Sequence, residues 1–269
     1  MTGRRLALLI EYDGSPPLSG SQLQKNARSV QGELEAAVAQ LTGERLRLAF
    51  AGRTDAGVHA FGQVAAFTTT SALATEVFVR GLNAVLPSSI AVRNAIEAPD
   101  DFDPRRHASS RTYRYMIYNA PIRSPLWLGR AWHVASPLDP KAMQEAAHVL
   151  VGQHNFAGFS RREGVTTIRC VHRCDVSSRP PFVELEMEAN AFLRQQVRRT
   201  AGALAQVGLG KQTAAGLRKL LSKAEPASAG PVAPAHGLYL VRVAYPTLDL
   251  EAAMRYDNPS AQKGRRLAR

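Results

Sequence analysis

The chain has 269 residues, of which 45% are hydrophobic and 21% are charged, a composition typical of a folded protein with one large domain or two smaller ones. Lys and Arg number 34 against 22 Asp and Glu, which gives a net charge of +12 at neutral pH and a sequence pI near 10.3. A basic excess of this size favours a polyanionic partner over a charge that serves solubility alone.

Two classes of protein are excluded by the apolar pattern and the cysteines. No uninterrupted apolar run approaches the ~18 residues needed to span a membrane, and the first apolar stretch soon meets Glu11 and Asp13. That stretch therefore predicts a strand and not a signal peptide. Cys170 and Cys174 cannot build a disulfide framework, which suits a reducing compartment and predicts a cytoplasmic protein.

The first hundred residues predict the element order β-α-β-β-α-β. Strands are expected over 5–12, 46–51, 63–70 and 90–96, and helices over 30–41 and 76–86. Ser29 is placed to cap the first helix and Gly43 to end it, and Pro87 stops the second. This order favours an α+β layer in which helices cover one face of a largely antiparallel sheet.

The second half repeats this rhythm less regularly. Strands are expected over 112–118, 166–177, 182–189 and 237–244, helices over 140–151, 193–207 and 213–221, and a surface loop over 225–234. The 182–189 strand alternates apolar and acidic residues, which is typical of a sheet with one wet face. With a boundary near 99–110, we expect an N-terminal domain over 1–104, a C-terminal domain over 105–250 and a basic tail over 251–269.

The strongest local motif is Ala51-Gly52-Arg53-Thr54-Asp55-Ala56-Gly57-Val58-His59-Ala60, between two β-like segments. Gly52 and Gly57 supply the positive φ or close backbone approach that a hairpin loop needs. The same loop places a guanidinium, a hydroxyl, a carboxylate and an imidazole close together, and loops on a rigid sheet often carry catalytic groups. From the residues alone, a surface turn with a solvated Arg and Asp explains the motif equally well.

This loop resembles the signature of the TruA-type tRNA pseudouridine synthases. Further stretches resemble the family in the same order along nearly the whole chain: Glu11-Tyr12-Asp13-Gly14, Val30-Gln31-Gly32, Gly62-Gln63-Val64, Arg111-Thr112-Tyr113-Arg114-Tyr115, Gly152-Gln153-His154-Asn155-Phe156, Ala189-Asn190-Ala191-Phe192-Leu193, Val197-Arg198 and Ala233-Pro234-Ala235-His236-Gly237-Leu238.

The resemblance implies a fold, a reaction and partners. The fold would be the α+β pseudouridine synthase core: two α/β halves with mainly antiparallel sheets, helices on one face and an active-site cleft between them. The reaction would convert uridine to pseudouridine in the anticodon stem-loop, at tRNA nucleotides 38 to 40, without a metal or organic cofactor. The family acts as a homodimer that cradles tRNA.

The resemblance also assigns roles to single residues. Asp55 would be the essential carboxylate, which could add to C1′ or to the base or remove a ribose proton, and the sequence leaves these roles open. Because it must stay ionised in a partly dry pocket, a cation is expected beside it, and the family pattern makes this Arg198. Tyr113 would stack on the target base, Leu238 would form pocket wall, and Arg53 would contact RNA. From spacing alone, Tyr113 and Leu238 fit core packing and Arg198 fits a basic helix face.

RNA affinity is expected from phosphate contacts by basic clusters. The candidates are Arg105, Arg106 and Arg111 near the domain boundary and Arg161 and Arg162 in the second half. The chain also departs from the family pattern. Gly20-Ser21-Gln22 stands where Gly-Trp-Gln is usual, and His154-Asn155-Phe156 replaces the usual His-Asp-Phe. The stretch Arg194-Gln195-Gln196 stands where the family tends to carry His and Met, and Arg199 where Asn is common.

Two other functions remain open from the residues. A metal-dependent hydrolase is conceivable because Asp55 and His59 lie four apart, and because strand alternation would put Cys170, His172 and Cys174 on one face. Zinc sites usually use a different spacing, so we do not favour a metal site. A non-catalytic RNA-binding module is the second alternative, suggested by the missing Trp.

Overall fold

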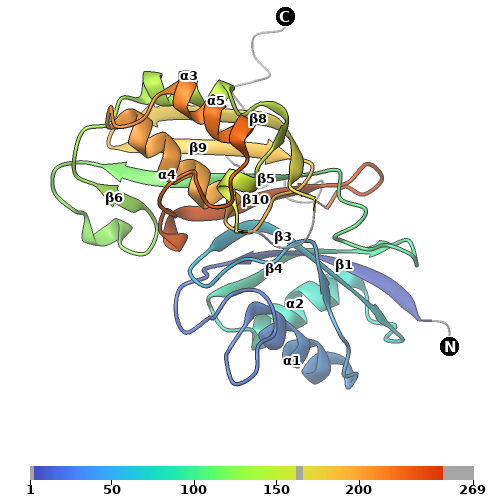
Figure 1. The fold of residues 1–269 in the computed structure, drawn as a ribbon. Coiled ribbons are helices and arrows are strands. Elements are labelled where there is room, and N and C mark those ends of the chain that lie inside the picture. Colours follow the sequence, from blue (N-terminus) through green and yellow to red (C-terminus); the bar gives the residue numbers. More distant parts are fainter. Residues whose placement is uncertain (1–2, 162–165, 251–269) are drawn as a thin grey trace, which may run out of the picture.

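Strands from the whole chain join in one twisted sheet (Figure 1). The computed structural model describes residues 3–161 and 166–250. Within these ranges the ten-stranded sheet has the order β4-β1-β3-β10-β5-β9-β8-β7, while β2 pairs with β3 and β6 with β5. All the pairings are antiparallel except β3 with β10 and β5 with β6. The predicted α+β class and its mainly antiparallel pairing are confirmed.

Strands and helices are interspersed along the chain. The first half contains β1 (Arg4–Tyr12), α1 (Val30–Thr42), β2 (Ala49–Phe50), β3 (His59–Thr69), α2 (Thr75–Val85) and β4 (Ile90–Ala98). The second half contains β5 (Ser110–Asn119), β6 (Trp132–Val134), α3 (Pro140–His148), β7 (Gly152–Asn155), β8 (Ile168–Arg179), β9 (Phe182–Ala189), α4 (Gln196–Gly208), α5 (Ala214–Lys223) and β10 (Leu238–Ala244). Short 3-10 turns occur at Pro125–Trp127, Ala157–Phe159 and Ala235–Gly237.

The first helix begins and ends at the residues that its caps predict. Ser29 Oγ accepts a hydrogen bond from the backbone N–H of Gly32, and Gly43 takes a φ of 76° while its N–H donates to the carbonyl of Ala39. A left-handed residue at this point costs a glycine little. The apolar side of the helix, including Val30 and Leu34, is fully buried.

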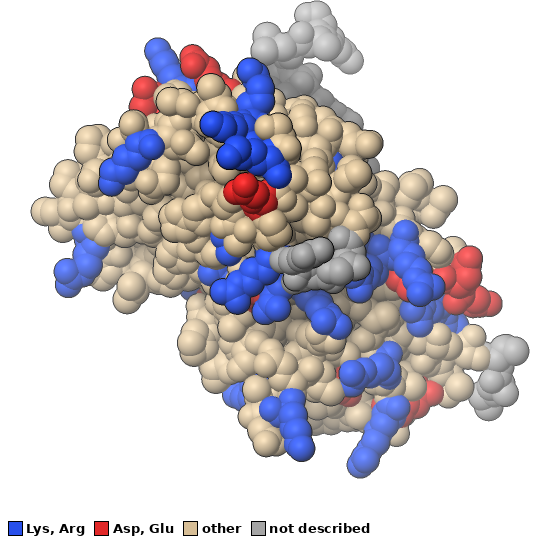
Figure 2. All heavy atoms as spheres, in the orientation of Figure 1, with Lys and Arg blue, Asp and Glu red and all other residues tan. Residues whose placement is uncertain are grey.

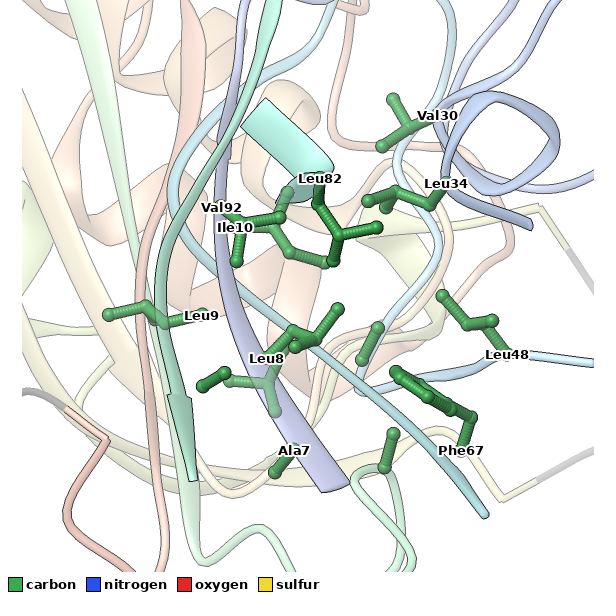
Figure 3. Close-up of a cluster of buried hydrophobic side chains, with 14 of the residues drawn as sticks. Ala7, Leu8, Leu9, Ile10, Val30, Leu34, Leu48, Phe67, Leu82 and Val92 are labelled. Atoms are coloured by element: carbon green, nitrogen blue, oxygen red, sulfur yellow. The ribbon is translucent and has the colours of Figure 1, made fainter. Parts of the chain in front are cut away.

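The core of the first half forms where α1 and α2 pack on the β1–β3–β4 part of the sheet. Figure 3 shows side chains from both helices and from β1 and β3 meeting in this cluster. Residues 6–10 of β1 are all buried, so this central strand is covered on both faces. Burial on both faces explains why residues 6–10 form an uninterrupted apolar run in the sequence.

A second cluster fills the space between the other half of the sheet and α3, α4 and α5. On β9, Val183, Leu185 and Met187 are buried, while the Glu residue that follows each of them is partly exposed, which confirms the predicted alternation. The domain boundary stays a prediction, because packing crosses it. Leu240 and Val243 of β10, from the predicted C-terminal domain, pack in the first cluster, and Val58, from the predicted N-terminal domain, packs in the second. The predicted basic tail, 251–269, lies outside the described residues.

Several predicted boundaries were wrong for local reasons. The strand expected over 46–51 is only Ala49–Phe50, because the peptide groups of Leu48 bond to side chains of α1: its N–H donates to Glu35 and its carbonyl accepts from Gln31. The helix expected over 193–207 begins at Gln196 because Gln195 has a φ of 62°. The short strands β6 and β7 were not predicted.

The two halves are joined by β10, which lies between β3 and β5. Its pairing with β3 is parallel and brings Tyr239 beside His59 and Leu240 beside Ala60. The register against β5 shifts between Leu240 and Arg242, which leaves Val241 bulged. Gly62 of β3 lies against this bulge, since a Cβ there would overlap the Val241 carbonyl. In the part of the chain that the structure describes, no helix is long and apolar enough to cross a membrane.

Gly62→Ala is therefore expected to destabilise the junction between the two halves. The added methyl must push β10 away from β3, and overpacking of this kind costs about 1–3 kcal/mol. Urea unfolding would measure the loss. Gly216→Ala in α5 is the control, because its Cβ meets only the flexible side chain of Gln212. Equal stability of the Gly62 variant and the wild type would show that the junction does not require a glycine.

Candidate active site

The signature loop, residues 51–58 between β2 and β3, is a tight turn held by its own backbone. The N–H of Val58 donates to the carbonyl of Asp55 over 3.1 Å, and the N–H of Gly57 donates to the carbonyl of Gly14 over 3.0 Å. Gly57 has a φ of 82°, a conformation that glycine adopts at little cost. The turn thus holds Asp55 just before β3 begins.

Buried polar side chains fix the residues that directly precede Asp55 in the loop. Tyr12 and Thr54 share a hydroxyl hydrogen bond of 2.8 Å, and the Gln63 amide donates to the Gly52 carbonyl over 3.0 Å and to Tyr12 over 3.4 Å. Ser21 Oγ accepts from the N–H of Thr54 over 2.8 Å. Burial raises the pKa of Tyr12 to about 12, so its hydroxyl stays protonated at physiological pH.

None of these buried residues was predicted as part of the site. Tyr12 and Gln63 lie in stretches that resemble the family, and this was the only signal for them in the sequence. Ser21 was noted only as a departure from a tryptophan, yet its hydroxyl binds the backbone next to Asp55. A side chain that holds the loop through one hydrogen bond produces no periodic pattern in the sequence, so it could not be predicted from periodicity.

Arg198 approaches Asp55 from the other half of the molecule. Its Nη1 lies 3.1 Å from Asp55 Oδ2, an ion pair between residues that are 143 positions apart. Arg198 stands in the first turn of α4, and its Nε donates to the carbonyl of Ala233 over 2.8 Å. The Asp55 side chain keeps 36% of its exposure and that of Arg198 keeps 16%. The carboxylate is thus both oriented and open to a substrate.

Tyr113 completes the group around the loop. It lies on β5 opposite Met187 of β9 and Leu240 of β10, and its ring meets that of Phe192 edge-on at 5.2 Å. A Cβ on Gly52 would lie 3.9 Å from the Tyr113 hydroxyl, so this side chain reaches the signature loop. Burial raises the pKa of Tyr113, and the Asp55 carboxylate raises it further against the opposing effect of Arg111, so the hydroxyl is neutral.

Leu238 is buried, whereas Arg53 is exposed to solvent. Leu238 begins β10 opposite Tyr115 and is 7% exposed, and it packs in the same apolar cluster as Val58 of the signature loop. Arg53 is exposed, and no ion pair holds it within residues 3–161 and 166–250. Leu238 is thus a buried apolar residue and Arg53 an exposed one, and their roles at the site remain predictions.

The predicted RNA-binding arginines occupy different environments. Arg105, Arg106 and Arg161 are exposed, although Arg106 lies 3.8 Å from Asp103. Figure 2 shows Lys and Arg side chains gathered where the two halves meet on this face. The surface is thus basic beside the junction.

Arg111 is half-buried, and its guanidinium forms hydrogen bonds to the backbone. Its guanidinium donates to the carbonyls of Ala108, Asn190, Ala51 and Arg105, so it ties the start of the signature loop to the second half. Phosphate binding by Arg111 remains a prediction. Arg162 lies outside the described residues.

His59 and the cysteine segment do not form the arrangements that a metal site would need. The His59 ring is 3% exposed, lies 3.0 Å from an Asp13 oxygen and from the Gly129 carbonyl, and stacks on Tyr239 at 4.7 Å. The expectation that Cys170, His172 and Cys174 share one face was wrong, because β8 is bulged between Val171 and Arg173, and Val171 and Cys174 both face the core.

Comparison with known proteins identifies the class to which this fold and site belong. The model of a family described as tRNA pseudouridine synthase matches residues 9–105 and 146–246. The chain belongs to this family.

Similar proteins from several bacteria match nearly the whole chain. The tRNA pseudouridine synthase A of Geotalea uraniireducens (strain Rf4) is 45% identical over 244 residues, which cover 90% of this chain and all of that protein. The protein of the same name from Roseiflexus sp. (strain RS-1) is 46% identical over 97% of each chain. That of Bordetella petrii is 44% identical over 90% of this chain and 91% of its own.

Removal of the Tyr12 hydroxyl tests whether the buried polar side chains hold the loop. Tyr12→Phe leaves Thr54 Oγ1 and Gln63 Nε2 short of a partner, and an unsatisfied buried polar group costs about 1–3 kcal/mol. Chemical unfolding would measure this loss. Tyr118→Phe is the control: in the described part of the chain its hydroxyl has no hydrogen bond, so its stability should change by no more than ~0.5 kcal/mol. The idea fails if the two variants lose equal stability.

Proposed function

We propose that this protein converts uridine to pseudouridine in the anticodon stem-loop of tRNA, at nucleotides among 38 to 40, with Asp55 as the catalytic carboxylate. The observation that carries the proposal is the pairing of Asp55 with Arg198 over 3.1 Å, beside Tyr113, in a member of the tRNA pseudouridine synthase family. Relatives named tRNA pseudouridine synthase A, 44% to 46% identical, support tRNA as the substrate.

The reaction breaks the N1–C1′ glycosidic bond, turns the uracil and rejoins it through C5. The reaction involves no oxidation and no hydrolysis, and the catalytic group that it requires is one ionised carboxylate. Asp55 could attack C1′ or the base, or remove a ribose proton, and each role requires the ionised form. Arg198 is the cation that pairs with the Asp55 carboxylate, and its bond to the Ala233 carbonyl holds it in place.

The target uridine must leave its stack before C1′ can be reached, at a cost of a few kcal/mol. Stacking on an aromatic ring offsets this cost by about 1–3 kcal/mol. Tyr113 is partly exposed and reaches the signature loop, so its ring is placed to receive the base. Leu238 extends the apolar wall.

Docking of the folded RNA is assigned to the exposed arginines. Arg53, Arg105, Arg106 and Arg161 are exposed, and basic side chains gather along the junction of the two halves (Figure 2). Phosphate contacts of this kind give affinity that weakens as salt rises. They would hold the stem-loop while Asp55 acts on one nucleotide.

Asp55→Ala should abolish pseudouridine formation and leave tRNA binding within about twofold of the wild type. The carboxylate is the reacting group, whereas phosphate contacts supply most of the affinity. Pseudouridine is measured on unmodified tRNA, and binding by filter retention. Asp101→Ala, at an exposed acidic residue, is the control and should keep full activity. Pseudouridine formation by the Asp55 variant would contradict the assignment.

Mapping of pseudouridines in total tRNA, with and without the protein, tests the reaction and the position together. Signals confined to nucleotides 38 to 40 support the proposal, and signals elsewhere in tRNA would overturn the anticodon assignment. If the wild type forms none, it is a non-catalytic RNA-binding module. Activity lost in EDTA and restored by zinc would instead support a metal-dependent enzyme.

We also propose that the protein works as a homodimer in the cytoplasm, as the resemblance implies. The observation in favour is an exposed apolar group on the segment between β5 and β6. Ile122, Leu126 and Leu128 are 79%, 84% and 81% exposed, and patches of this kind on monomers often mark protein contacts. Trp127 of the same segment packs on Phe182 of β9, which fixes the position of the group.

A Leu126→Glu, Leu128→Glu double variant should therefore shift the protein from dimer to monomer. Two carboxylates in an apolar contact must be desolvated without partners. Light scattering after size exclusion measures the mass. Val151→Glu, at another exposed apolar residue, is the control and should stay dimeric. A monomeric wild type, or a double variant that remains dimeric, would exclude this surface as the dimer contact.

A further inference from the structure

Buried hydrogen-bond donors without acceptors cluster on one face of α4. Gln196, Arg199 and Thr200 are 1%, 6% and 0% exposed and follow each other at helical spacing on the side that faces loop 225–234. Gln196 Nε2, Arg199 Nε, Thr200 Oγ1 and, from the loop, Ser228 Oγ have no partner among the described residues. Buried polar atoms are normally satisfied, so such a cluster needs an explanation.

The cluster contains a buried cation without a carboxylate. Arg199 Nη1 donates to the carbonyls of Ala227 and Gly230, on either side of Ser228, and no ion pair is formed with it in the described ranges. Buried arginines are usually paired with an acid. Burial lowers the pKa of Arg199, and the charges of Arg161 and Arg198 lower it further, so the three guanidinium groups lie within electrostatic range of one another.

The chemistry that would satisfy this group is an anion with several oxygens. Each of its unpartnered atoms can donate a hydrogen bond, its net charge is positive, and arginines bind phosphate oxygens in this way. The site is close to the reacting group, because Arg198, the next residue, pairs with Asp55. In an RNA strand, a phosphate lies beside every base that could enter the site.

We propose that Arg199 binds a backbone phosphate of the RNA strand next to the nucleotide held at Asp55. The proposal rests on the proposed function and adds a contact to it. Gln196 and Arg199 are both departures from the family pattern, so this phosphate contact is a feature of this chain's own residues. The positive end of α4, which begins at Gln196, favours an anion at the same place.

The competing role for Arg199 is structural. Its bonds to the Ala227 and Gly230 carbonyls brace loop 225–234, and this loop also holds Arg198 through Ala233. A brace alone would require neither the buried charge nor an anion. The two roles therefore differ in how the protein responds to phosphate and to salt.

The test compares Arg199→Gln and Arg199→Lys with the wild type and with Arg80→Gln, which removes an exposed arginine of α2. The affinity for the unmodified tRNA is measured over a range of salt concentrations. Arg199→Gln should weaken binding about tenfold and lower the slope of log affinity against log salt by about 0.7 to 0.9, the value for one phosphate contact. Arg199→Lys should retain the slope, and Arg80→Gln should match the wild type.

A second measurement separates anion binding from bracing. Thermal unfolding is followed as inorganic phosphate replaces chloride at constant ionic strength. Phosphate stabilises folded proteins in general, so the Tm of the wild type and of Arg80→Gln should rise more than that of Arg199→Gln, which keeps only this general effect. The proposal is overturned if Arg199→Gln keeps the wild-type slope or the wild-type phosphate response, or if the wild type shows no response. A lower Tm with both responses intact would establish the brace.

Pseudouridine formation is assayed on the same samples. If the wild type forms none, the proposed function fails, while the salt slope and the phosphate response still decide the anion site by the same criteria. The two failures are therefore distinguishable.

Discussion

The parallel pairing of β10 with β3 is the contact on which the site depends. It consists of two residue pairs, Tyr239 with His59 and Leu240 with Ala60, and it turns the strands of two halves into one sheet. His59 ends the signature loop, and the segment before Tyr239 leads back through Ala233 to α4. Because the two segments are fixed side by side, Asp55 of one half and Arg198 of the other lie 3.1 Å apart.

The ion pair itself contributes little to holding the halves together. A partly exposed pair of this kind stabilises a protein by about 0–1 kcal/mol, since water screens both charges. The pairing of β10 with β3 and the hydrogen bond from Arg111 to the Ala51 carbonyl join the two halves instead. The Asp55–Arg198 pair instead sets the orientation of a carboxylate that stays partly exposed, as the proposed catalytic role requires.

Local patterns predicted the elements well, and long-range contacts could not be predicted from them. Ser29 and Gly43 defined α1, and the alternation of Val183, Leu185 and Met187 defined the face of β9, because caps and periodicity act over a few residues. The parallel β3–β10 pairing joins segments about 180 positions apart and has no local pattern. For the site, Asp55, Tyr113 and Arg198 came from the family resemblance, since spacing cannot place residues of two halves together.

The net charge of +12 is divided between two uses that composition cannot separate. Arg53, Arg105 and Arg161 are exposed and can reach phosphates, whereas Arg111 donates to four backbone carbonyls. From the sequence, Arg111 was predicted to bind RNA like its neighbours. An arginine that bonds to backbone carbonyls needs no acidic residue nearby, so the sequence contains no sign of its partners. Arg199 is bonded to carbonyls in the same way but keeps a buried nitrogen without an acceptor, and this difference sets it apart as a group that still lacks a partner.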